Sequence, residues 1–455
     1  MSEESAAKNT TPGTTDAPAP EQAPAEAPEQ APAEEEAPPA PLLELREPLT
    51  DVIDTPAALA AYCEALAAAT GPVAIDAERA SGYRYSSRAY LIQLRREGAG
   101  SALVDPIAFD SLAPVQEAIG DAEWILHAAT QDLACLAEVG LRPTSLFDTE
   151  LAGRLLGHPR VGLASLVETL LGRRMRKEHS AVDWSKRPLP RPWLEYAALD
   201  VEVLLELRAL LVTELAETGK TEWARQEFEH LLDFTPAVRA EPWRRVSGSH
   251  RLRGRRALGA VRELWTTRDE IARTRDVTPG RVLPDAAIIA AAEAMPTTRA
   301  ALLATPGFKG RGADRYAARW VAAVEAVLAM PESELPARVP RGDGPPPPRA
   351  WADKDPVAAR RLVLARERTV ALAEELHLPV ENLLTPDYLR RLVWTPPATR
   401  VRADLLVAVG EQLASYGARP WQVELTAPVL TDAVLDGDVE PPVTSPDEAA
   451  AAADD

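Results

Sequence analysis

Four acids and a tyrosine in the first half of the sequence have types and spacing that make them candidates for a divalent-metal site. Asp76 and Glu78 end the stretch GPVAIDAE, in which a Gly-Pro pair precedes a short apolar run, a pattern that predicts a buried strand. Residues i and i+2 of a strand point to the same side, so the two carboxylates would repel each other without a cation between them. A divalent metal with oxygen ligands suits this pair best. The alternative is a strand end at which both acids are hydrated.

Two further acids lie in segments with a helical pattern. Asp132 belongs to HAATQDLACL and follows the apolar run Trp124–His127. Its place at a helix start also allows a simple interaction with the helix dipole. Asp200 lies in the apolar segment WLEYAALDVEVLLEL, four residues after Tyr196, so both side chains share one helical face. An acid in such a helix needs a partner or a ligand, unless the Tyr–Asp edge faces solvent.

The elements that must position these side chains predict a mixed α/β domain over residues 45–232. Strand-like runs alternate with helical patterns, and a GAGS turn between two of the runs favours an antiparallel pair. Strands are expected at 71–78, 88–96, 102–104 and 124–127, and helices from 55, at 109–119, at 131–139 and almost throughout 148–232.

The rest of the chain predicts two helical modules between linkers and tails. Each module has a long Arg-rich helix, a short loop and a second helix led by Pro-Asp, at 284–285 and at 386–387, which indicates a duplication. The expected parts are a disordered acidic Pro/Ala/Glu tail (1–41), an Arg-rich linker (233–253), a helical module (254–330), a Pro-rich linker (331–354), a second helical module (355–430) and a disordered acidic tail (437–455).

The net charge of −19 comes mainly from the two ends of the chain. Residues 1–50 hold eleven acidic side chains against two basic ones, and residues 435–455 hold seven against none, so the part between is close to neutral. Cys63 and Cys135 lie in Ala/Leu-rich helical patterns and are expected as small core residues, without a disulfide or zinc site. Without a signal-peptide pattern or a membrane-length apolar run, we expect a soluble cytoplasmic protein.

The order of the acids resembles the DEDD superfamily of 3′–5′ exonucleases, in the subgroup with a tyrosine in its last motif. AIDAE…YLIQL resembles the first motif of ribonuclease D proteins, HAATQDL the second, and AVDWSKRPLPRPWLEYAALDV the segment through the last. The resemblance covers about residues 45–232. One departure is Trp193, where the family more often has glutamine. The two helical modules resemble the HRDC domain, named for helicases and ribonuclease D.

The resemblance implies an RNase H-like exonuclease fold followed by two all-α modules. It implies a metal-dependent 3′–5′ exoribonuclease that releases nucleotides from RNA 3′ ends, such as those of tRNA precursors. Apart from the resemblance, we expect a monomer without an evident protein partner. Two divalent ions, Mg²⁺ or Mn²⁺, would be held by Asp76, Glu78, Asp132 and Asp200, and Tyr196 would orient or deprotonate the attacking water. The alternatives are a 3′–5′ DNA exonuclease and a non-catalytic nucleic-acid-binding scaffold.

Several basic side chains are candidates for contact with the nucleic-acid backbone. His127 either contacts the substrate or is a hydrogen-bonded histidine at a strand end. The other candidates lie in loops or in the Arg-rich stretch, where a solvated loop or a charged linker is the alternative. No RNP motif is present, so sequence-specific readout is not expected. The candidates besides His127 are Lys186, Arg187, Arg251, Arg253, Arg255, Arg256, Lys309 and Arg311.

Overall fold

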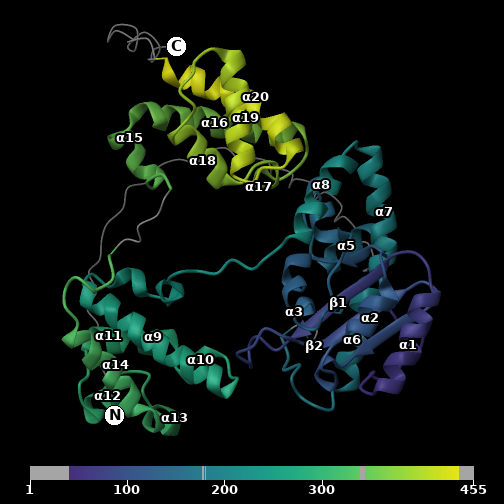
Figure 1. Ribbon diagram of the computed structural model, residues 1–455, viewed down its shortest axis with the longest axis horizontal. Helices are drawn as coiled ribbons and strands as arrows, with labels where there is room; N and C mark the ends of the chain where they lie inside the picture. Colours follow the sequence, from purple (N-terminus) through teal and green to yellow (C-terminus); the bar gives the residue numbers. More distant parts are fainter. Residues whose placement is uncertain (1–39, 177–178, 180, 339–343, 440–455) are drawn as a thin grey trace, which may run out of the picture. The chain divides into compact units, whose positions relative to one another are not determined.

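The computed structural model describes residues 40–176, 179, 181–338 and 344–439, without the side chain of Arg311. The two expected acidic tails therefore lie almost wholly outside the described residues. Within them the chain forms a sheet domain (residues 40–234), a first helical module (242–336) and a second helical module (348–438), which Figure 1 shows in blue, green and yellow-green.

A mixed five-stranded sheet in the order β3-β2-β1-β4-β5 organises the sheet domain. The first three strands are antiparallel neighbours, as the short turn between two of them predicts, while β4 and β5 add in parallel beside β1. Strand β5 was not predicted, because only Leu146 and Phe147 of its residues are apolar, a shorter run than the one that predicts β4. The strands are β1 (Val73–Arg79), β2 (Ala89–Arg96), β3 (Gly100–Val104), β4 (Trp124–Leu126) and β5 (Leu146–Asp148).

Helices pack against this sheet and enclose its apolar residues. Helix α6 packs across β1, β2 and β3, whereas α7 packs on β1 and β4 and α8 on β5 (Figure 1). The expected helix at 109–119 begins only at Ala113, with Pro114 in its first turn, where a missing N–H group has no cost. The elements are α1 (Pro56–Ala68), η1 (Pro106–Ala108), α2 (Ala113–Ile119), η2 (Ala129–Gln131), α3 (Leu133–Glu138), α4 (Thr149–Leu156), α5 (Leu163–Leu171), α6 (Arg191–Glu202), α7 (Leu204–Glu217) and α8 (Thr221–Leu232).

The first helical module has a core of its own. Trp243, Val246 and Leu252 are buried in that core, so its packing begins ahead of the boundary expected at residue 254. Helix α9 is the longest element of the module and packs against both α11 and α14. The elements are η3 (Pro242–Arg245), η4 (Ser249–Arg251), α9 (Arg255–Arg275), α10 (Pro279–Val282), α11 (Asp285–Ala294), α12 (Arg299–Ala304), α13 (Gly310–Arg315) and α14 (Ala317–Ala329).

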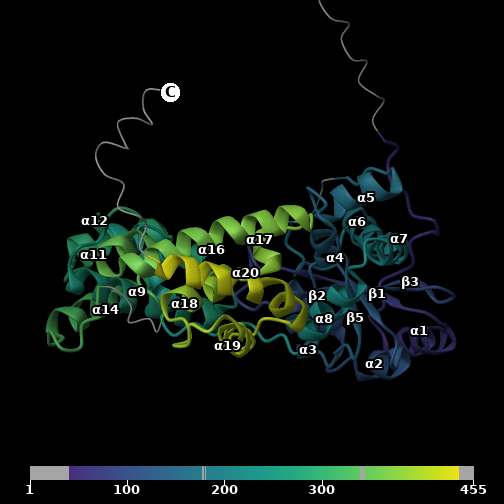
Figure 2. The same cartoon turned by 90° about the horizontal axis from the view of Figure 1, so that it is seen from above.

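In the second helical module the long helices α16 and α20 lie side by side, as Figure 2 shows. Their contact, together with α18 and α19, buries a third apolar core. The elements are η5 (Pro348–Ala350), α15 (Trp351–Lys354), α16 (Pro356–Glu375), α17 (Val380–Leu383), α18 (Pro386–Trp394), α19 (Arg402–Ser415) and α20 (Pro420–Asp438).

The second helical module also shares apolar contacts with the sheet domain. Trp421 is buried in the same core as the sheet, and its ring stacks on that of Trp223 with centroids 4.9 Å apart. Lys220 donates hydrogen bonds to the carbonyl oxygens of Leu155 and Leu376, 2.8 Å each, and so links α4 to the end of α16. At Gly157, with φ +82°, a Cβ atom would lie 2.2 Å from the carbonyl oxygen of His377. This close backbone approach admits only glycine.

The cysteines and the apolar character of the helices can be compared with the expectations from composition. Cys63 and Cys135 are both unpaired thiols, and Cys135 is buried in the sheet-domain core. None of the helices in the described part of the chain has the length and apolar character needed to cross a bilayer.

Candidate active site

Strand β1 carries the first pair of acids to one end of the sheet. Its apolar residues Val73, Ala74 and Ile75 are fully buried, and the strand continues through Asp76 and Glu78, both half-buried. The pairing with β2 shifts directly after Glu78, which is an irregularity of the β-bulge kind. The acids therefore belong to the strand itself and not to a frayed end of it.

The turn after β4 delivers the third acid. Ala128 has left-handed backbone geometry (φ 58°), and the carboxylate of Asp148 accepts hydrogen bonds from the N–H groups of Ala128 and Ala129, at 3.0 and 2.8 Å. The same carboxylate accepts from two N–H groups at the start of α4 and is its N-cap. Asp132 follows at the start of α3 and is 5% exposed. Asp148 thus acts as a backbone clamp for the turn that carries Asp132.

Helix α6 brings the last two side chains, Tyr196 and Asp200, onto the same region of the sheet. Its last residue, Glu202, is 1% exposed, forms an ion pair with Arg95 at 3.1 Å and accepts a hydrogen bond from Ser101 at 3.2 Å. This buried ion pair fixes the end of α6 to strands β2 and β3. Because Asp200 lies two residues before Glu202, this ion pair also fixes the position of Asp200 along the sheet.

All five predicted side chains lie on one cavity of about 620 Å³. Carboxylate oxygens of Asp76, Glu78 and Asp200 lie within 4.8 Å of one another, although Asp200 follows Glu78 by more than 120 residues in sequence. Asp132 joins them from the turn after β4, with Arg79 3.9 Å from its carboxylate. Besides the five, the cavity wall includes Arg79, Ser81, Gly82, Tyr83, His127, Gln131, Met175 and Arg176.

Burial and, for three of them, repulsion from other acids raise the pKa values of the four acids in this cluster. Burial raises the pKa of Asp76 to about 6, and burial with repulsion from the other three acids raises the pKa of Glu78 to about 10. The pKa values of Asp132 and Asp200 are raised by burial and by Asp76. Arg79 offsets only part of this repulsion. An all-oxygen set of carboxylates with excess negative charge fits a hard divalent cation, so the cluster implies the use of a divalent metal.

Two further side chains on the cavity wall, Tyr196 and His127, are neutral and can form hydrogen bonds to a ligand. Burial raises the pKa of Tyr196, with Asp200 as the next cause, so its hydroxyl is a neutral hydrogen-bond donor. Burial lowers the pKa of His127 to about 4, and its Nδ1 lies 2.9 Å from Thr149 Oγ1. His127 is thus a hydrogen-bonded, neutral histidine at a strand end that also lies on the cavity wall.

Three of the arginine and lysine candidates have structural partners. Arg187 forms a double ion pair with Asp105, at 2.5 and 2.6 Å, and also donates to the carbonyl oxygen of Tyr90. Arg255 donates to the carbonyl oxygens of Leu335 and Pro336, while Arg256 donates to three carbonyl oxygens near the end of α14 and to Glu332. These contacts engage the guanidinium groups within the protein and argue against the predicted RNA contact there.

The remaining candidates are exposed. Lys186 lies in the loop before α6, Arg251 and Arg253 lie just ahead of α9, and Lys309 precedes α13. The Arg311 side chain lies outside the described residues. Contact between these residues and RNA stays a prediction.

Sequence reasoning missed two groups on the cavity. Arg79 directly follows Glu78 in the motif DAER and lies on the cavity wall. A cation next to paired acids is the sequence feature that could have identified it. Tyr83 lies in the segment SGYRYSSR, whose alternating tyrosines and arginines are typical of a nucleic-acid contact. Trp193, the departure from the family pattern, packs edge-on against Trp184 with centroids 5.6 Å apart.

Comparison with known proteins agrees with this geometry. A family model described as 3'-5' exonuclease matches residues 50–216, one described as HRDC domain matches 257–324, and one described as 3' to 5' exonuclease C-terminal domain matches 344–434. The ribonuclease D of Jannaschia sp. is 33% identical over 301 residues, which cover 62% of this chain and 76% of that protein. The second helical module therefore has a family description of its own, distinct from HRDC.

Two solved structures extend the likeness over most of the chain. A protein from Bifidobacterium adolescentis is 40% identical, with a TM-score of 0.79, over 87% of this chain and 99% of that one. Escherichia coli RNase D, described as an exoribonuclease involved in structured RNA processing, is 27% identical, with a TM-score of 0.60, over 81% and 99%. Fold and site together define a 3′–5′ exonuclease of RNase H-like fold with helical modules. The chain belongs to the ribonuclease D family and is a 3′–5′ exoribonuclease.

Proposed function

We propose that this exoribonuclease shortens structured RNA, such as tRNA precursors, from the 3′ end by two-metal-ion hydrolysis with Mg²⁺ or Mn²⁺. The observation that supports the proposal is the mutual approach of three carboxylates within 4.8 Å, with a fourth acid and a tyrosine on the same cavity. The structured substrate is proposed from the likeness to Escherichia coli RNase D. The ligands of the ions would be Asp76, Glu78, Asp132 and Asp200.

Each residue has a distinct part in this proposal. When bound, the ions supply a lowered pKa for the attacking water and charge stabilisation for the leaving 3′ oxygen. The neutral hydroxyl of Tyr196, on the same face of α6 as Asp200, donates a hydrogen bond that orients the water. His127 is held in one orientation by Thr149 and can hydrogen-bond to the RNA backbone without contributing charge. The partly buried setting strengthens these interactions relative to bulk water.

The direct test is to follow the shortening of a 5′-labelled RNA with Mg²⁺ in wild type and Asp200→Asn. Turnover of the variant should fall by more than about 100-fold. Loss of a residue that only supports a metal ligand costs up to about 100-fold, and here the ligand itself is lost. RNA affinity should stay within about twofold, since α6 and its anchor Glu202 are unchanged. Wild-type turnover in the variant would contradict the assignment of Asp200.

The same assay separates the role of Tyr196 from that of the ligands. Tyr196→Phe should lower turnover by about 100-fold, the lower end for a positioned proton donor or acceptor. The metal-dependent rise in melting temperature should persist in Tyr196→Phe and shrink in Asp200→Asn. Equal loss of metal binding in both would show that the tyrosine holds the acids in place and does not act on the water.

A matched DNA oligonucleotide tests the alternative substrate. Four carboxylates and a tyrosine do not themselves distinguish a ribose from a deoxyribose, so a DNA-shortening rate equal to that on RNA would favour the DNA exonuclease alternative. We propose the monomer and the cytoplasmic location as further expectations; sedimentation of the purified chain tests the first, and cell fractionation the second.

A further inference from the structure

The loop between β1 and β2 contacts both the catalytic cavity and the first helical module. Ser81, Gly82 and Tyr83 lie on the wall of the cavity. A few residues later, Tyr85 and Ser86 contact helix α9 and its C-terminal cap. The loop is therefore the segment through which a helical module of unassigned role reaches the site of hydrolysis.

The cap residue of α9 holds the backbone of this loop. Asp276 has left-handed geometry, φ 46° and ψ 53°, which acidic and amide side chains tolerate best after glycine. One of its carboxylate oxygens accepts hydrogen bonds from the N–H groups of Tyr85 and Ser86, at 3.2 Å each. Thr278 N–H adds a bond of 3.1 Å to the carbonyl oxygen of Tyr83. Three backbone groups of the loop are thus paired with the helical module.

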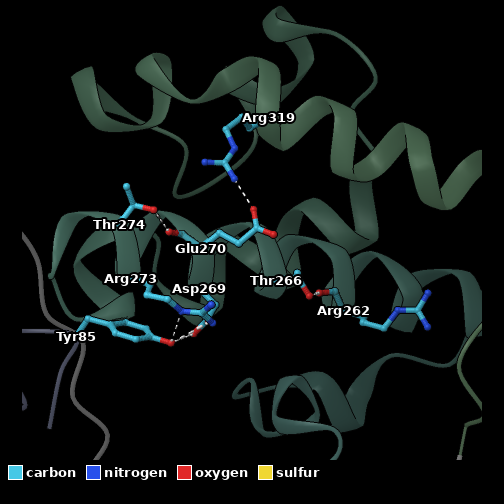
Figure 3. Close-up of polar contacts among 8 residues, drawn as sticks. All are labelled: Tyr85, Arg262, Thr266, Asp269, Glu270, Arg273, Thr274 and Arg319. Atoms are coloured by element: carbon cyan, nitrogen blue, oxygen red, sulfur yellow. Dashed lines mark hydrogen bonds and ion pairs between the residues drawn. The ribbon is translucent and has the colours of Figure 1, made fainter.

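The side chain of Tyr85 makes a second attachment, about two turns back on the same helix. Figure 3 shows its hydroxyl pointing at Asp269, which accepts from it at 3.0 Å and is itself 2.7 Å from Arg273. The Asp269 side chain is only 13% exposed. Figure 3 also shows Arg319 paired with Glu270 on α9, away from the loop. The contacts of Tyr85 and Asp276 together form what we call the loop clamp.

Beside this clamp an arginine stacks on Tyr83, a residue of the cavity wall. The guanidinium of Arg281 lies over the ring of Tyr83, 4.2 Å from its centroid, and the residue is exposed. Among the described residues no carboxylate or carbonyl oxygen accepts a hydrogen bond from this guanidinium. A guanidinium stacked on a tyrosine keeps all its N–H donors for an anion, and this geometry suits a phosphate.

We propose that the corner between α9 and α10 forms one wall of the RNA entry path, where Arg281 binds a backbone phosphate of the nucleotides that precede the scissile bond. The inference rests on the proposed function, because it assumes that the 3′ end lies at the acid cluster. In this arrangement the loop clamp keeps Tyr83 in place beneath Arg281. The ligand is the phosphodiester backbone of a single strand, without base specificity.

Arg281→Gln tests the phosphate contact, with Arg319→Gln as the matched control on the same module. Loss of one contact to a single strand should lower the salt slope of binding by about 0.7, which corresponds to about fivefold weaker binding of a 3′-single-stranded RNA at 0.1 M salt. A dinucleotide without a 5′-phosphate has only the scissile phosphate and none for Arg281 to bind, so its hydrolysis should be unchanged. Arg319→Gln should match wild type in each measurement.

The outcomes distinguish this inference from the proposed function. Wild-type affinity and slope in Arg281→Gln, or an equal loss in Arg319→Gln, would overturn the phosphate contact while dinucleotide hydrolysis continues. A wild-type enzyme that hydrolyses no RNA with either metal would instead refute the proposed function. For the clamp, Asp276→Ala should speed hydrogen exchange at the Tyr85 and Ser86 amides at least tenfold, and unchanged exchange would overturn that part.

Discussion

At the scale of single residues, the site depends on carboxylates that are costly to charge. Four acids share a cavity in which Arg79 is the nearest cation to Asp132, and burial raises the pKa of each acid. Such a group favours protonation in the folded protein until a metal replaces the proton. Metal binding and pH should therefore be linked at this site.

The first prediction concerns that linkage. Because the folded pKa of Asp76 is about 6, above its ordinary value, the metal-free fold is favoured below its unfolded pKa, and this contribution is lost as the pH rises through about 6. Mg²⁺ or Mn²⁺ should thus raise the melting temperature more at pH 8 than at pH 5. Thermal unfolding at both pH values, with metal and with chelator, measures this. An equal shift at both values would contradict it.

A second prediction concerns Gln93, which pairs with Asp76 across β1 and β2. Gln93 is fully buried, and neither atom of its side-chain amide has a hydrogen-bond partner in the described structure. Since an unpaired buried polar group costs about 1–3 kcal/mol, Gln93→Met should raise the free energy of unfolding by about 1–2 kcal/mol. Urea unfolding measures the change. A loss of stability would show that the amide has a partner in solution.

The types and spacing of residues predicted which side chains gather at the site. An i, i+2 pair on a strand and an i, i+4 pair on a helix share a face by geometry alone, so Asp76 with Glu78 and Tyr196 with Asp200 could be paired in advance. The pairing of Arg187 with Asp105 could not, because 82 residues separate them and neither has a local pattern that points to the other.

At the scale of elements, strand β1 was predictable and β5 was not. An apolar run after a turn marks β1, whereas Leu146–Asp148 has only two apolar residues before an acid, and it pairs in parallel with β4. The region 148–232, which was expected to be helical almost throughout, has its longest non-helical stretch between α5 and α6. Packing against distant elements, which local patterns do not encode, decides these boundaries.

A third prediction tests the clamp at Asp148. Its carboxylate accepts hydrogen bonds from four N–H groups, two in the turn after β4 and two in α4. Asp148→Ala should lower the free energy of unfolding by about 2–4 kcal/mol, since a cap and buried donors are lost together. Asp355→Ala is the control, because that N-cap accepts from one N–H group and should cost about 1 kcal/mol. Equal losses would refute the double role.

At the scale of the whole molecule, the second helical module is joined to the sheet domain through buried contacts. Trp421 is 1% exposed, and its indole N–H donates to Glu227, which also pairs with Arg419. In the sequence Trp421 has the pattern of an ordinary core residue of an amphipathic helix. A contact between two modules was therefore beyond prediction from periodicity.

A fourth prediction follows from this contact. Trp421→Ala should cost about 3–5 kcal/mol of unfolding free energy and separate one thermal transition into two, because the shared core is lost. Trp394→Ala is the control, since that ring packs on Trp351 inside the module, with centroids 4.7 Å apart. Trp394→Ala should destabilise the second helical module but leave its contact with the sheet domain intact, so no additional thermal transition should appear. A single transition in Trp421→Ala would show that the docking does not depend on that ring.

Gly157 makes the contact between the sheet domain and the second helical module sensitive to substitution at this position. A single methyl group there would overlap the His377 carbonyl oxygen at 2.2 Å, and neither backbone can turn aside as a flexible side chain would. Grafting a foreign catalytic domain onto this carboxyl-terminal half would therefore succeed only where the graft keeps a bare backbone at that spot.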